Sequence, residues 1–455
     1  MSDEVADRSI KLEVSLPSGR CETVVVSQVG TVADLKLAAQ RSFGQGFLRL
    51  IARDGRLLEP TYPLPLSGLQ DGDSLIAVAS RPKIAAIKSA FALWCLGGDR
   101  VVTWGDPYYG GDSSRVHHRL QNVQEICGAG DAFAAILADG SVVTWGQAST
   151  GGDSSKVRNQ LRNVQQICGS GSAFAAILMN GTVVTWGAEH WGINNSGDSS
   201  SVQDQLRNVQ QICGARSAFA AILADGRVVT WGKERGGGDS STVQDQLQNV
   251  QQVFSTDCAF AAVLRDRSIV TWGDPNYGGD SSRIQNQLRN VQQICSTDSA
   301  FAAILEDGRV VTWGNDDHGG DSSGVHSQLR NVQQICGTCF AFAATLRDGS
   351  VVTWGHPKYG GHSSRVQNQL RNIQQICGTD SAFAAVLADG RVVTWGDRHG
   401  GGDSSRIQHQ LQNVQQICST DSAFAAILAD GTVVTWGNSS RGGDSSRVQD
   451  QFSYI

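Results

Sequence analysis

Residues 291–314, VQQICSTDSAFAAILEDGRVVTWG, decide the fold of this 455-residue chain. The first five residues form a strand candidate, and a polar turn follows at 296–299. The apolar run 300–305 is long enough for a buried strand but too short for a stable helix. Asp307-Gly308 comes next, and an Asp-Gly pair between two apolar runs predicts a hairpin because both turn residues need a positive φ. The stretch therefore predicts three antiparallel strands.

The segment 315–330 that follows has a variable tip, then Gly-Gly-Asp-Ser-Ser, then Val325 and Leu329 at an i, i+4 spacing. This spacing allows one helical turn capped by Asp321 or Ser322, and a fourth, irregular strand is equally open. In either form the segment crosses to the next unit.

The same unit recurs along the chain, and Thr-Trp-Gly marks each copy. A three-stranded unit has little core of its own, so neighbouring units are expected to stack face to face. A ring of such sheets is a β-propeller, and a period of about 40 residues suits a blade. The nine marker tryptophans are Trp104, Trp145, Trp186, Trp231, Trp272, Trp313, Trp354, Trp395 and Trp436. We expect them to be wedge-shaped core between sheets.

Cysteine usage follows the repeat. One thiol closes the motif QQIC or QEIC in seven copies, and the total of eleven is odd. Free cysteine packs as a small hydrophobe, which predicts unpaired thiols and a reducing compartment. Cys336 and Cys339 form a Cys-x-x-Cys pair without a redox fold around it, so no catalytic or metal role is expected for it.

Residues 9–80 follow a different pattern and predict a small α+β domain, after an N-terminus at 1–8 that we expect to be disordered. Strands are expected at 10–16, 22–26, 47–52 and 74–79, and Thr31 is expected to cap a helix at 32–41. The repeats then fill residues 82–455. The predicted fold is thus an all-β array of nine short blades behind an α+β domain.

The repeat pattern Val-x-x-Ile-Cys-Gly, Ala-Phe-Ala-Ala-x-Leu, Asp-Gly-x-Val-Val-Thr-Trp-Gly resembles the regulator-of-chromosome-condensation repeat over residues 82–455. These units are shorter than those of the better-known members, and in this they are similar to a bacterial β-lactamase-inhibitor propeller. The resemblance implies a β-propeller with compact blades. Both of the resembled propellers have seven blades, so nine copies leave the closure of the ring open.

The N-terminal segment resembles ubiquitin, through Thr31-Val-Ala-Asp-Leu-Lys36, Arg49-Leu-Ile51 and Asp73-Ser-Leu-Ile76. This implies a β-grasp domain built into a longer chain. Matching the motifs places the apolar patch by which other proteins grip ubiquitin at Leu16, Ile51 and Val78. The alternative is that Ile51 and Val78 only contribute to the core of a small sheet.

Composition excludes several function classes. The net charge is −6 and no run of five lysines and arginines occurs, so nucleic acid is a poor partner. The first ten residues show no basic region followed by an apolar stretch, and no window of 18 apolar residues occurs, so we expect no secretory leader, no membrane partner and a location in the cytoplasm or the nucleus.

Chemistry-bearing motifs are missing from their required contexts, so we expect no enzyme activity, no cofactor and no metal. Gly-Gly-Asp-Ser-Ser is superficially similar to calcium-binding nonapeptides, but it lacks their tandem spacing. Its aspartates are instead expected to form Asx-turns or caps, namely Asp112, Asp153, Asp280 and Asp403.

Function is expected where the copies differ, which is in the tips that follow Thr-Trp-Gly. Tyrosine, tryptophan, histidine and arginine gather there, and these residue types anchor protein interfaces. Unconstrained loop drift is the alternative. The candidate partner-binding residues are Tyr108, Tyr109, His190, Trp191, Arg235, Tyr277, His318, Lys358, Tyr359, Arg398 and His399.

The predicted function is a non-catalytic protein-interaction scaffold, in which the tips hold a protein and the ubiquitin-like domain links to the ubiquitin machinery. A first alternative is a substrate-recognition component of a ubiquitin ligase, because the repeats resemble those of large HECT-type ligases, whose catalytic domain is not in these residues. A second is guanine-nucleotide exchange on a small GTPase, the activity of the founding propeller.

Overall fold

The computed structural model describes residues 9–96, 98, 100–188 and 196–455, and it contains one four-stranded sheet and nine three-stranded sheets. Blade 1 comprises β5 (Pro82–Ala86), β6 (Ala90–Cys95) and β7 (Val101–Gly105); blade 2 comprises β8 (Val123–Ala129), β9 (Ala132–Leu137) and β10 (Val142–Gly146); blade 3 comprises β11 (Val164–Gly169), β12 (Ala173–Leu178) and β13 (Val183–Gly187). Blade 4 comprises β14 (Val209–Gly214), β15 (Ala218–Leu223) and β16 (Val228–Gly232); blade 5 comprises β17 (Val250–Ser255), β18 (Ala259–Leu264) and β19 (Ile269–Gly273); blade 6 comprises β20 (Val291–Ser296), β21 (Ala300–Leu305) and β22 (Val310–Gly314). Blade 7 comprises β23 (Val332–Gly337), β24 (Ala341–Leu346) and β25 (Val351–Gly355); blade 8 comprises β26 (Ile373–Gly378), β27 (Ala382–Leu387) and β28 (Val392–Gly396); blade 9 comprises β29 (Val414–Ser419), β30 (Ala423–Leu428) and β31 (Val433–Gly437).

The middle strand of each blade is buried on both faces. In β21, Phe301 packs into the cluster shared with blade 5, whereas Ala300 and Ile304 pack into the cluster shared with blade 7. Successive side chains of a strand point to opposite faces, so an unbroken apolar run packs against the preceding blade on one face and against the following blade on the other. The predicted three-stranded hairpin unit is confirmed, although within the Asp307-Gly308 pair Gly308 alone has a positive φ, of 77°.

The marker tryptophans lock each blade onto the one before it. Trp313 stacks on Phe301 of its own blade at 5.1 Å between ring centroids, and its indole N–H donates to the Gly278 carbonyl of blade 5 at 3.0 Å. Only 5% of its surface is exposed. The wedge role predicted for these residues is confirmed.

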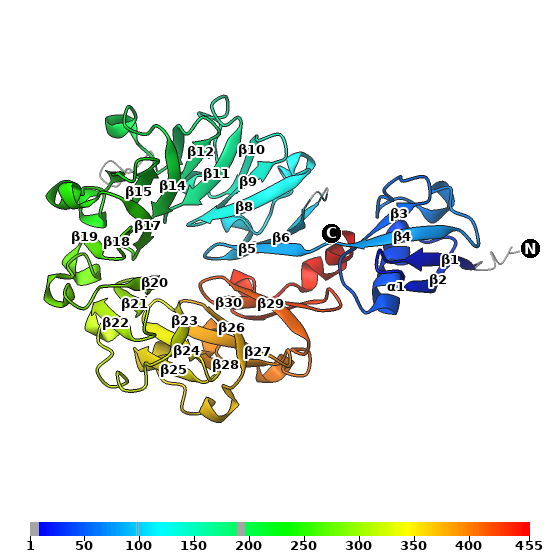
Figure 1. Cartoon of the computed structure of the whole chain (residues 1–455). Helices are drawn as coiled ribbons and strands as arrows, with labels where there is room; N and C mark the ends of the chain where they lie inside the picture. Colours follow the sequence, from blue (N-terminus) through cyan, green and yellow to red (C-terminus); the bar gives the residue numbers. More distant parts are fainter. Residues whose placement is uncertain (1–8, 97, 99, 189–195) are drawn as a thin grey trace, which may run out of the picture.

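The ring is closed, which answers the question that nine copies left open. The Trp104 indole of blade 1 donates to the Gly442 carbonyl after blade 9 at 3.1 Å, as the other tryptophans do to their preceding blades. Phe91 of β6 and Ala423 of β30 share one apolar cluster. Figure 1 shows blade 9, in orange and red, beside blade 1, whose strands β5 and β6 are light blue.

The segments between blades form short 3-10 helices and turns, so of the two alternatives left open, a helical turn is closer than a fourth strand. The four aspartates predicted to make Asx-turns do so, each accepting from the backbone N–H two residues on. These bonds measure 2.8 Å at Asp112, 2.9 Å at Asp153, 2.9 Å at Asp280 and 3.0 Å at Asp403.

The N-terminal sheet comprises β1 (Ser9–Ser15), β2 (Cys21–Ser27), β3 (Leu48–Ala52) and β4 (Ser74–Ala79) in the order β2-β1-β4-β3. Its central strands β1 and β4 are parallel, and both outer pairs are antiparallel. Helix α1 (Val32–Phe43) packs on one face, and Thr31 caps it in a capping box with Asp34. The predicted elements are confirmed, although the helix runs two residues further, to a left-handed cap at Gly44.

All eleven cysteines lie in the described residues and are free, as predicted. Over the same residues, no helix has the length and apolar character needed to span a membrane.

Candidate functional site

A cavity of about 710 Å³ lies where the turns between the first and second strands of the nine blades converge. We call the residues at the equivalent position of each turn the axial ring. Backbone hydrogen bonds join its members from blade to blade, including Asp298 N–H to Cys339 O at 3.1 Å and Asp421 N–H to Lys88 O at 3.1 Å. The axial ring, in chain order, consists of Lys88, Gly130, Gly171, Arg216, Asp257, Asp298, Cys339, Asp380 and Asp421.

Charge is divided between the two halves of the axial ring. Its basic members, Lys88 and Arg216, flank two glycines, whereas four of the five consecutive positions in blades 5–9 are aspartates. Ion pairs mark the two borders, with Arg216 at 3.1 Å from Asp257 and Arg441 at 3.5 Å from Asp421. Asp298 and Asp380, the other two carboxylates of the acidic half, are not partners in these two ion pairs.

The acidic half shifts the pKa values of its own groups. Burial, followed by the neighbouring Asp257 and Asp380, raises the pKa of Asp298 to about 6. Burial and the adjacent Asp380 raise the pKa of Asp421 to about 7. Burial and the flanking carboxylates likewise raise the pKa of the Cys339 thiol, so this cysteine is protonated and a poor nucleophile at neutral pH.

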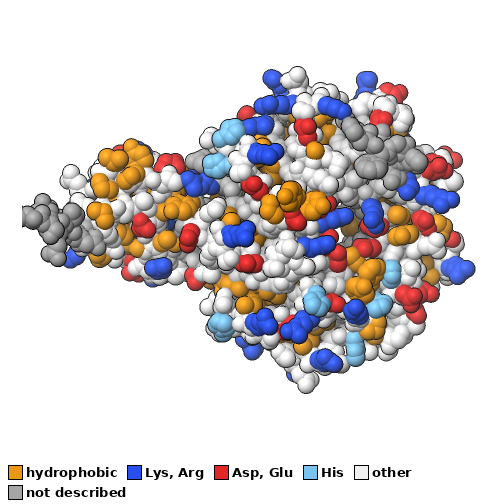
Figure 2. Space-filling model, turned by 180° about the vertical axis from the view of Figure 1, so that it is seen from behind, with side chains coloured by type: hydrophobic (Ala, Val, Ile, Leu, Met, Phe, Trp, Pro, Cys, Tyr) orange, Lys and Arg blue, Asp and Glu red, His pale blue; other side chains and the backbone are white. Residues whose placement is uncertain are grey.

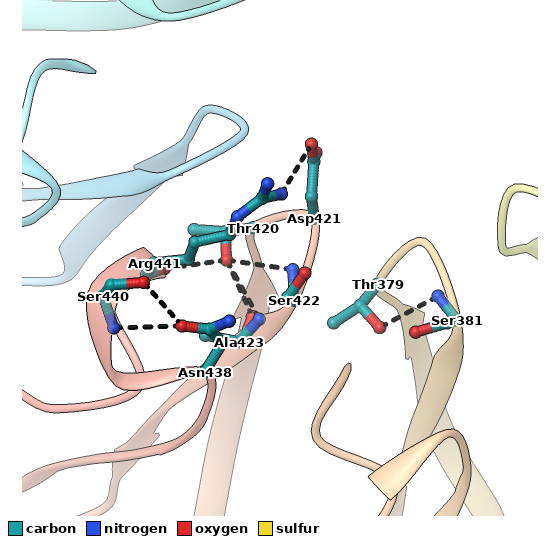
Figure 3. A network of polar contacts seen from close by, with 9 residues as sticks. All are labelled: Thr379, Ser381, Thr420, Asp421, Ser422, Ala423, Asn438, Ser440 and Arg441. Carbon is teal, nitrogen blue, oxygen red and sulfur yellow. Dashed lines mark hydrogen bonds and ion pairs between the residues drawn. The ribbon is translucent and has the colours of Figure 1, made fainter. Parts of the chain in front are cut away.

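A threonine in each of the turns of blades 5–9 connects the axial ring to the tip of the same blade. Figure 3 shows Thr420, whose hydroxyl accepts from the Ala423 N–H at 3.0 Å and donates to the Arg441 carbonyl at 3.0 Å. Thr379 bridges to the Gly400 carbonyl in the same way, at 2.9 Å. The axial ring and the tips consequently belong to one face of the propeller, which we call the tip face.

The tips themselves are single 3-10 turns closed by glycine. Gly319 has a φ of 94°, and a Cβ placed on it would lie 2.6 Å from the Phe342 ring of the next blade. This packing holds the tip backbone in place while its side chains vary. The tip turns are η2 (Pro107–Tyr109), η4 (Ala148–Thr150), η6 (Glu234–Gly236), η8 (Pro275–Tyr277), η10 (Asp316–His318), η11 (Pro357–Tyr359), η13 (Arg398–Gly400) and η15 (Ser439–Arg441).

The predicted tip residues divide into two groups by exposure. Tyr108 is 84% exposed, and five others are also exposed: Tyr109, Arg235, Lys358, Arg398 and His399. Tyr277, His318 and Tyr359 are half-buried. His190 and Trp191 lie outside the described residues.

An aromatic cluster on the tip face joins blades 6 and 7. The His318 and Phe340 ring centroids are 4.2 Å apart, Phe340 and Tyr359 are 4.6 Å apart, and Tyr359 and His356 are 4.9 Å apart. Phe340 directly follows Cys339 of the axial ring, so the cluster borders the acidic half. All four residues are half-buried, so each keeps part of its surface accessible.

Phe340 and the axial ring are the site residues that our sequence reasoning missed. The position of Phe340 holds a small or polar residue in the other eight copies: Ser89, Asp131, Ser172, Ser217, Cys258, Ser299, Ser381 and Ser422. The fold therefore does not require an aromatic ring there. Aligning the copies at this turn would have revealed it.

The N-terminal domain presents a second apolar surface, on the face of the sheet opposite α1. Ile51 and Val78 are half-buried there, and Ile76, paired with Ile51, is 45% exposed. Figure 2 shows hydrophobic side chains gathered on this domain. The prediction for Leu16 was wrong: it is 8% exposed and packs in the domain core, because it continues the inward alternation of Leu12 and Val14.

Among the residues that the structure describes, no three His, Cys, Asp or Glu side chains are grouped so that they could hold a metal ion. The acidic half of the axial ring is a set of carboxylates spread over separate blades.

Comparison with known proteins gives structural likeness only. No protein family model matches the chain, and no curated protein matches it. Prp20p from Saccharomyces cerevisiae is 13% identical, with 74% of this chain and 86% of that chain covered and a TM-score of 0.38. The CRINKLY WD40 ectodomain of the Arabidopsis thaliana receptor kinase ACR4 is 16% identical, with 60% and 97% covered and a TM-score of 0.35. A designed protein based on ubiquitin is 28% identical, with 15% and 85% covered and a TM-score of 0.14. Because these scores are low, the propeller assignment rests on the sheets and their packing.

Proposed function

We propose that this protein is a non-catalytic interaction scaffold whose tip face binds a protein partner. The observation that carries the proposal is the aromatic cluster of His318, Phe340, Tyr359 and His356, in which Phe340 directly follows Cys339 of the axial ring. Partly exposed aromatic rings that the fold does not need are the residue types that dominate binding energy at protein interfaces.

Charge indicates the kind of partner. Next to the cluster, Asp298 and Asp380 flank Cys339 and line the axial cavity. Carboxylates beside aromatic rings attract arginine and lysine side chains by charge and by cation-π contact. The partner segment is therefore a basic one that also carries apolar side chains, and its binding weakens as salt rises.

The N-terminal domain has a separate role in this proposal, as a ubiquitin-like module that connects the scaffold to ubiquitin-recognising proteins. The strand order β2-β1-β4-β3, the parallel central pair and the single helix on one face support the likeness to ubiquitin. Ile51, Ile76 and Val78 supply an apolar surface at the place where ubiquitin is gripped.

Affinity capture with the full-length chain tests both surfaces in one experiment. Phe340→Ser installs the serine that the neighbouring blades carry at this position. We expect at least one stoichiometric partner to be lost from the capture, because removing an aromatic anchor weakens binding affinity by about tenfold or more. Ile51→Ala is expected to remove a different set, the proteins with ubiquitin-recognising domains. Met179→Ser, 76% exposed in the hairpin turn of blade 3 at the strand ends opposite the tips, is the matched control.

Binding of each candidate is then measured with purified proteins at two salt concentrations. A tip-face partner is expected to keep its affinity for Met179→Ser, lose it for Phe340→Ser and bind more weakly at high salt. Partners that bind wild type and Phe340→Ser equally would refute the tip-face proposal. If the proteins with ubiquitin-recognising domains bind wild type and Ile51→Ala equally, the proposed role of the N-terminal sheet is refuted.

A further inference from the structure

The interface between blades 9 and 1 differs from the other eight, because there the two ends of the array meet. Elsewhere a crossing segment leads from the last strand of one blade directly into the first strand of the next. We call the blade 9–blade 1 interface the seam. The seam contains the Trp104 to Gly442 hydrogen bond and the shared apolar cluster. These contacts hold blades 9 and 1 together although no crossing segment leads from blade 9 to blade 1.

Along the array, each blade also contacts the hairpin of the blade before it. Val164 N–H donates to the Gly140 carbonyl at 2.9 Å, and Val332 N–H donates to the Gly308 carbonyl at 3.0 Å. The preceding residue, such as Asn163 with a φ of 54°, sits so close that a Cβ on Gly140 would lie 2.9 Å from its Cα. The recurring contact therefore consists of a residue with a left-handed backbone and, directly after it, a residue whose N–H donates to a carbonyl of the preceding hairpin.

Blade 1 cannot make this contact at the seam. Its residue in the position of Val164 is Pro82, which pairs with Cys95 as Val164 pairs with Leu178. Proline has no backbone N–H, so it has nothing to donate to the last hairpin, at Asp430-Gly431. The hairpin of blade 9 would therefore lack the contact that hairpins elsewhere in the array receive.

The N-terminal domain occupies that place instead. Gly46 N–H donates to the Ala429 carbonyl at 3.1 Å, and a Cβ on Gly46 would lie 2.1 Å from the Gly431 Cα. Phe47 follows with a φ of 56°, inside the range of the repeated asparagines, and is 3% exposed. Its ring belongs to the apolar cluster of the seam together with Phe91 and Trp104.

A second contact lies beside the first. The C-terminal turn η16 (Ser446–Tyr454) packs against both β7 and α1, and Phe452 meets the Trp104 ring edge-on at 5.3 Å. The Lys36 ammonium donates to the Ile455 carbonyl and is 3% exposed. Burial lowers the pKa of Lys36 to about 8.

We propose that the N-terminal domain is an intramolecular clasp that holds the propeller ring closed. Its Gly46-Phe47 corner occupies the place against the last hairpin that a following blade would take, although its donor, Gly46, precedes the left-handed Phe47 and bonds to the Ala429 carbonyl. Because the domain uses α1 and this corner for the contact, its opposite sheet face, with Ile51, Ile76 and Val78, stays free. Partner binding to that face is thus compatible with a closed ring.

Tryptophan fluorescence of the full chain tests the clasp, because all eleven tryptophans lie at position 94 or later and report on the propeller alone. Gly46→Val and Phe47→Ser change only the N-terminal domain. We expect both to lower the midpoint of thermal unfolding reported by tryptophan by several degrees. Val25→Ser, on the outer face of the same sheet and 53% exposed, is the matched control and is expected to leave it unchanged.

Hydrogen exchange separates opening of the seam from unfolding of the N-terminal domain by itself. Amides of blades 1 and 9 are expected to exchange faster in Phe47→Ser, with blades 4 and 5 unchanged. The milder Phe47→Leu is expected to show the same pattern with a smaller shift. A tryptophan midpoint equal to that of Val25→Ser, or an exchange increase confined to residues 9–80, would overturn the proposal.

Discussion

Replacing Trp104 by alanine is expected to destabilise the propeller more than the matched substitution Trp354→Ala. Both tryptophans are almost fully buried, stack on a phenylalanine at about 5 Å and donate an indole hydrogen bond to the preceding blade. Removing a buried tryptophan costs about 3–5 kcal/mol, through lost burial and the cavity left behind. Trp354→Ala should fall in this range.

The loss of stability for Trp104→Ala should exceed that range because the cavity that this substitution leaves lies at the seam. Phe452 loses its aromatic partner there, and no crossing segment holds blade 9 against blade 1. Denaturant unfolding followed by circular dichroism measures both losses in free energy of unfolding. An equal or smaller loss for Trp104→Ala would mean that the seam contributes no more than an ordinary blade interface.

The propeller is expected to lose stability as pH rises from 5 to 8. Asp298 and Asp421 have folded-state pKa values of about 6 and about 7, above the ordinary 3.8. At pH 5 the unfolded chain has already released these protons while the folded chain largely retains them. A raised folded-state pKa therefore adds stability at low pH, and that stability disappears as pH passes through the folded value.

Asp298→Asn is the variant that isolates this effect. Asparagine mimics the protonated side chain and releases no proton on unfolding, so the variant should melt at a higher temperature than wild type, by a margin that is larger at pH 8 than at pH 5. Asp307 lies in an exposed hairpin turn, where the hydrogen bond that it accepts from the Arg309 backbone N–H lowers its pKa, so its carboxylate is ionised at both pH values. Asp307→Asn should therefore shift the midpoint equally at pH 5 and pH 8. A midpoint for Asp298→Asn that parallels wild type from pH 5 to 8 would contradict the assignment.

Local features of the fold followed from the sequence, whereas features that depend on the whole ring did not. The hairpin at Asp307-Gly308 and the buried strand 300–305 are set by neighbours in the chain, so their patterns were sufficient. Closure depends on the rotation between blades summed over nine interfaces, and small differences accumulate. The contact of Gly46 with Gly431 joins residues too far apart in sequence for any local pattern to show.

The candidate site was predicted in part. The tips were correctly expected to be variable turns, and His318 and Tyr359 of the predicted set belong to the aromatic cluster. Phe340 and the aspartates of the axial ring stand in turns that we considered only polar connections. Their convergence requires knowing that the first strand of every blade is the innermost, which the repeat pattern alone does not specify.

Distances between blade tips test the closed nine-bladed ring most directly. Spin labels carried by unnatural amino acids can be placed at Tyr108, Ser149 and Ser440, equivalent exposed tips of blades 1, 2 and 9. A closed ring makes blades 1 and 2 and blades 9 and 1 equivalent neighbours, so the 108–440 distance distribution should coincide with the 108–149 distribution. A clearly longer 108–440 distance would show an open spiral and contradict the closed ring.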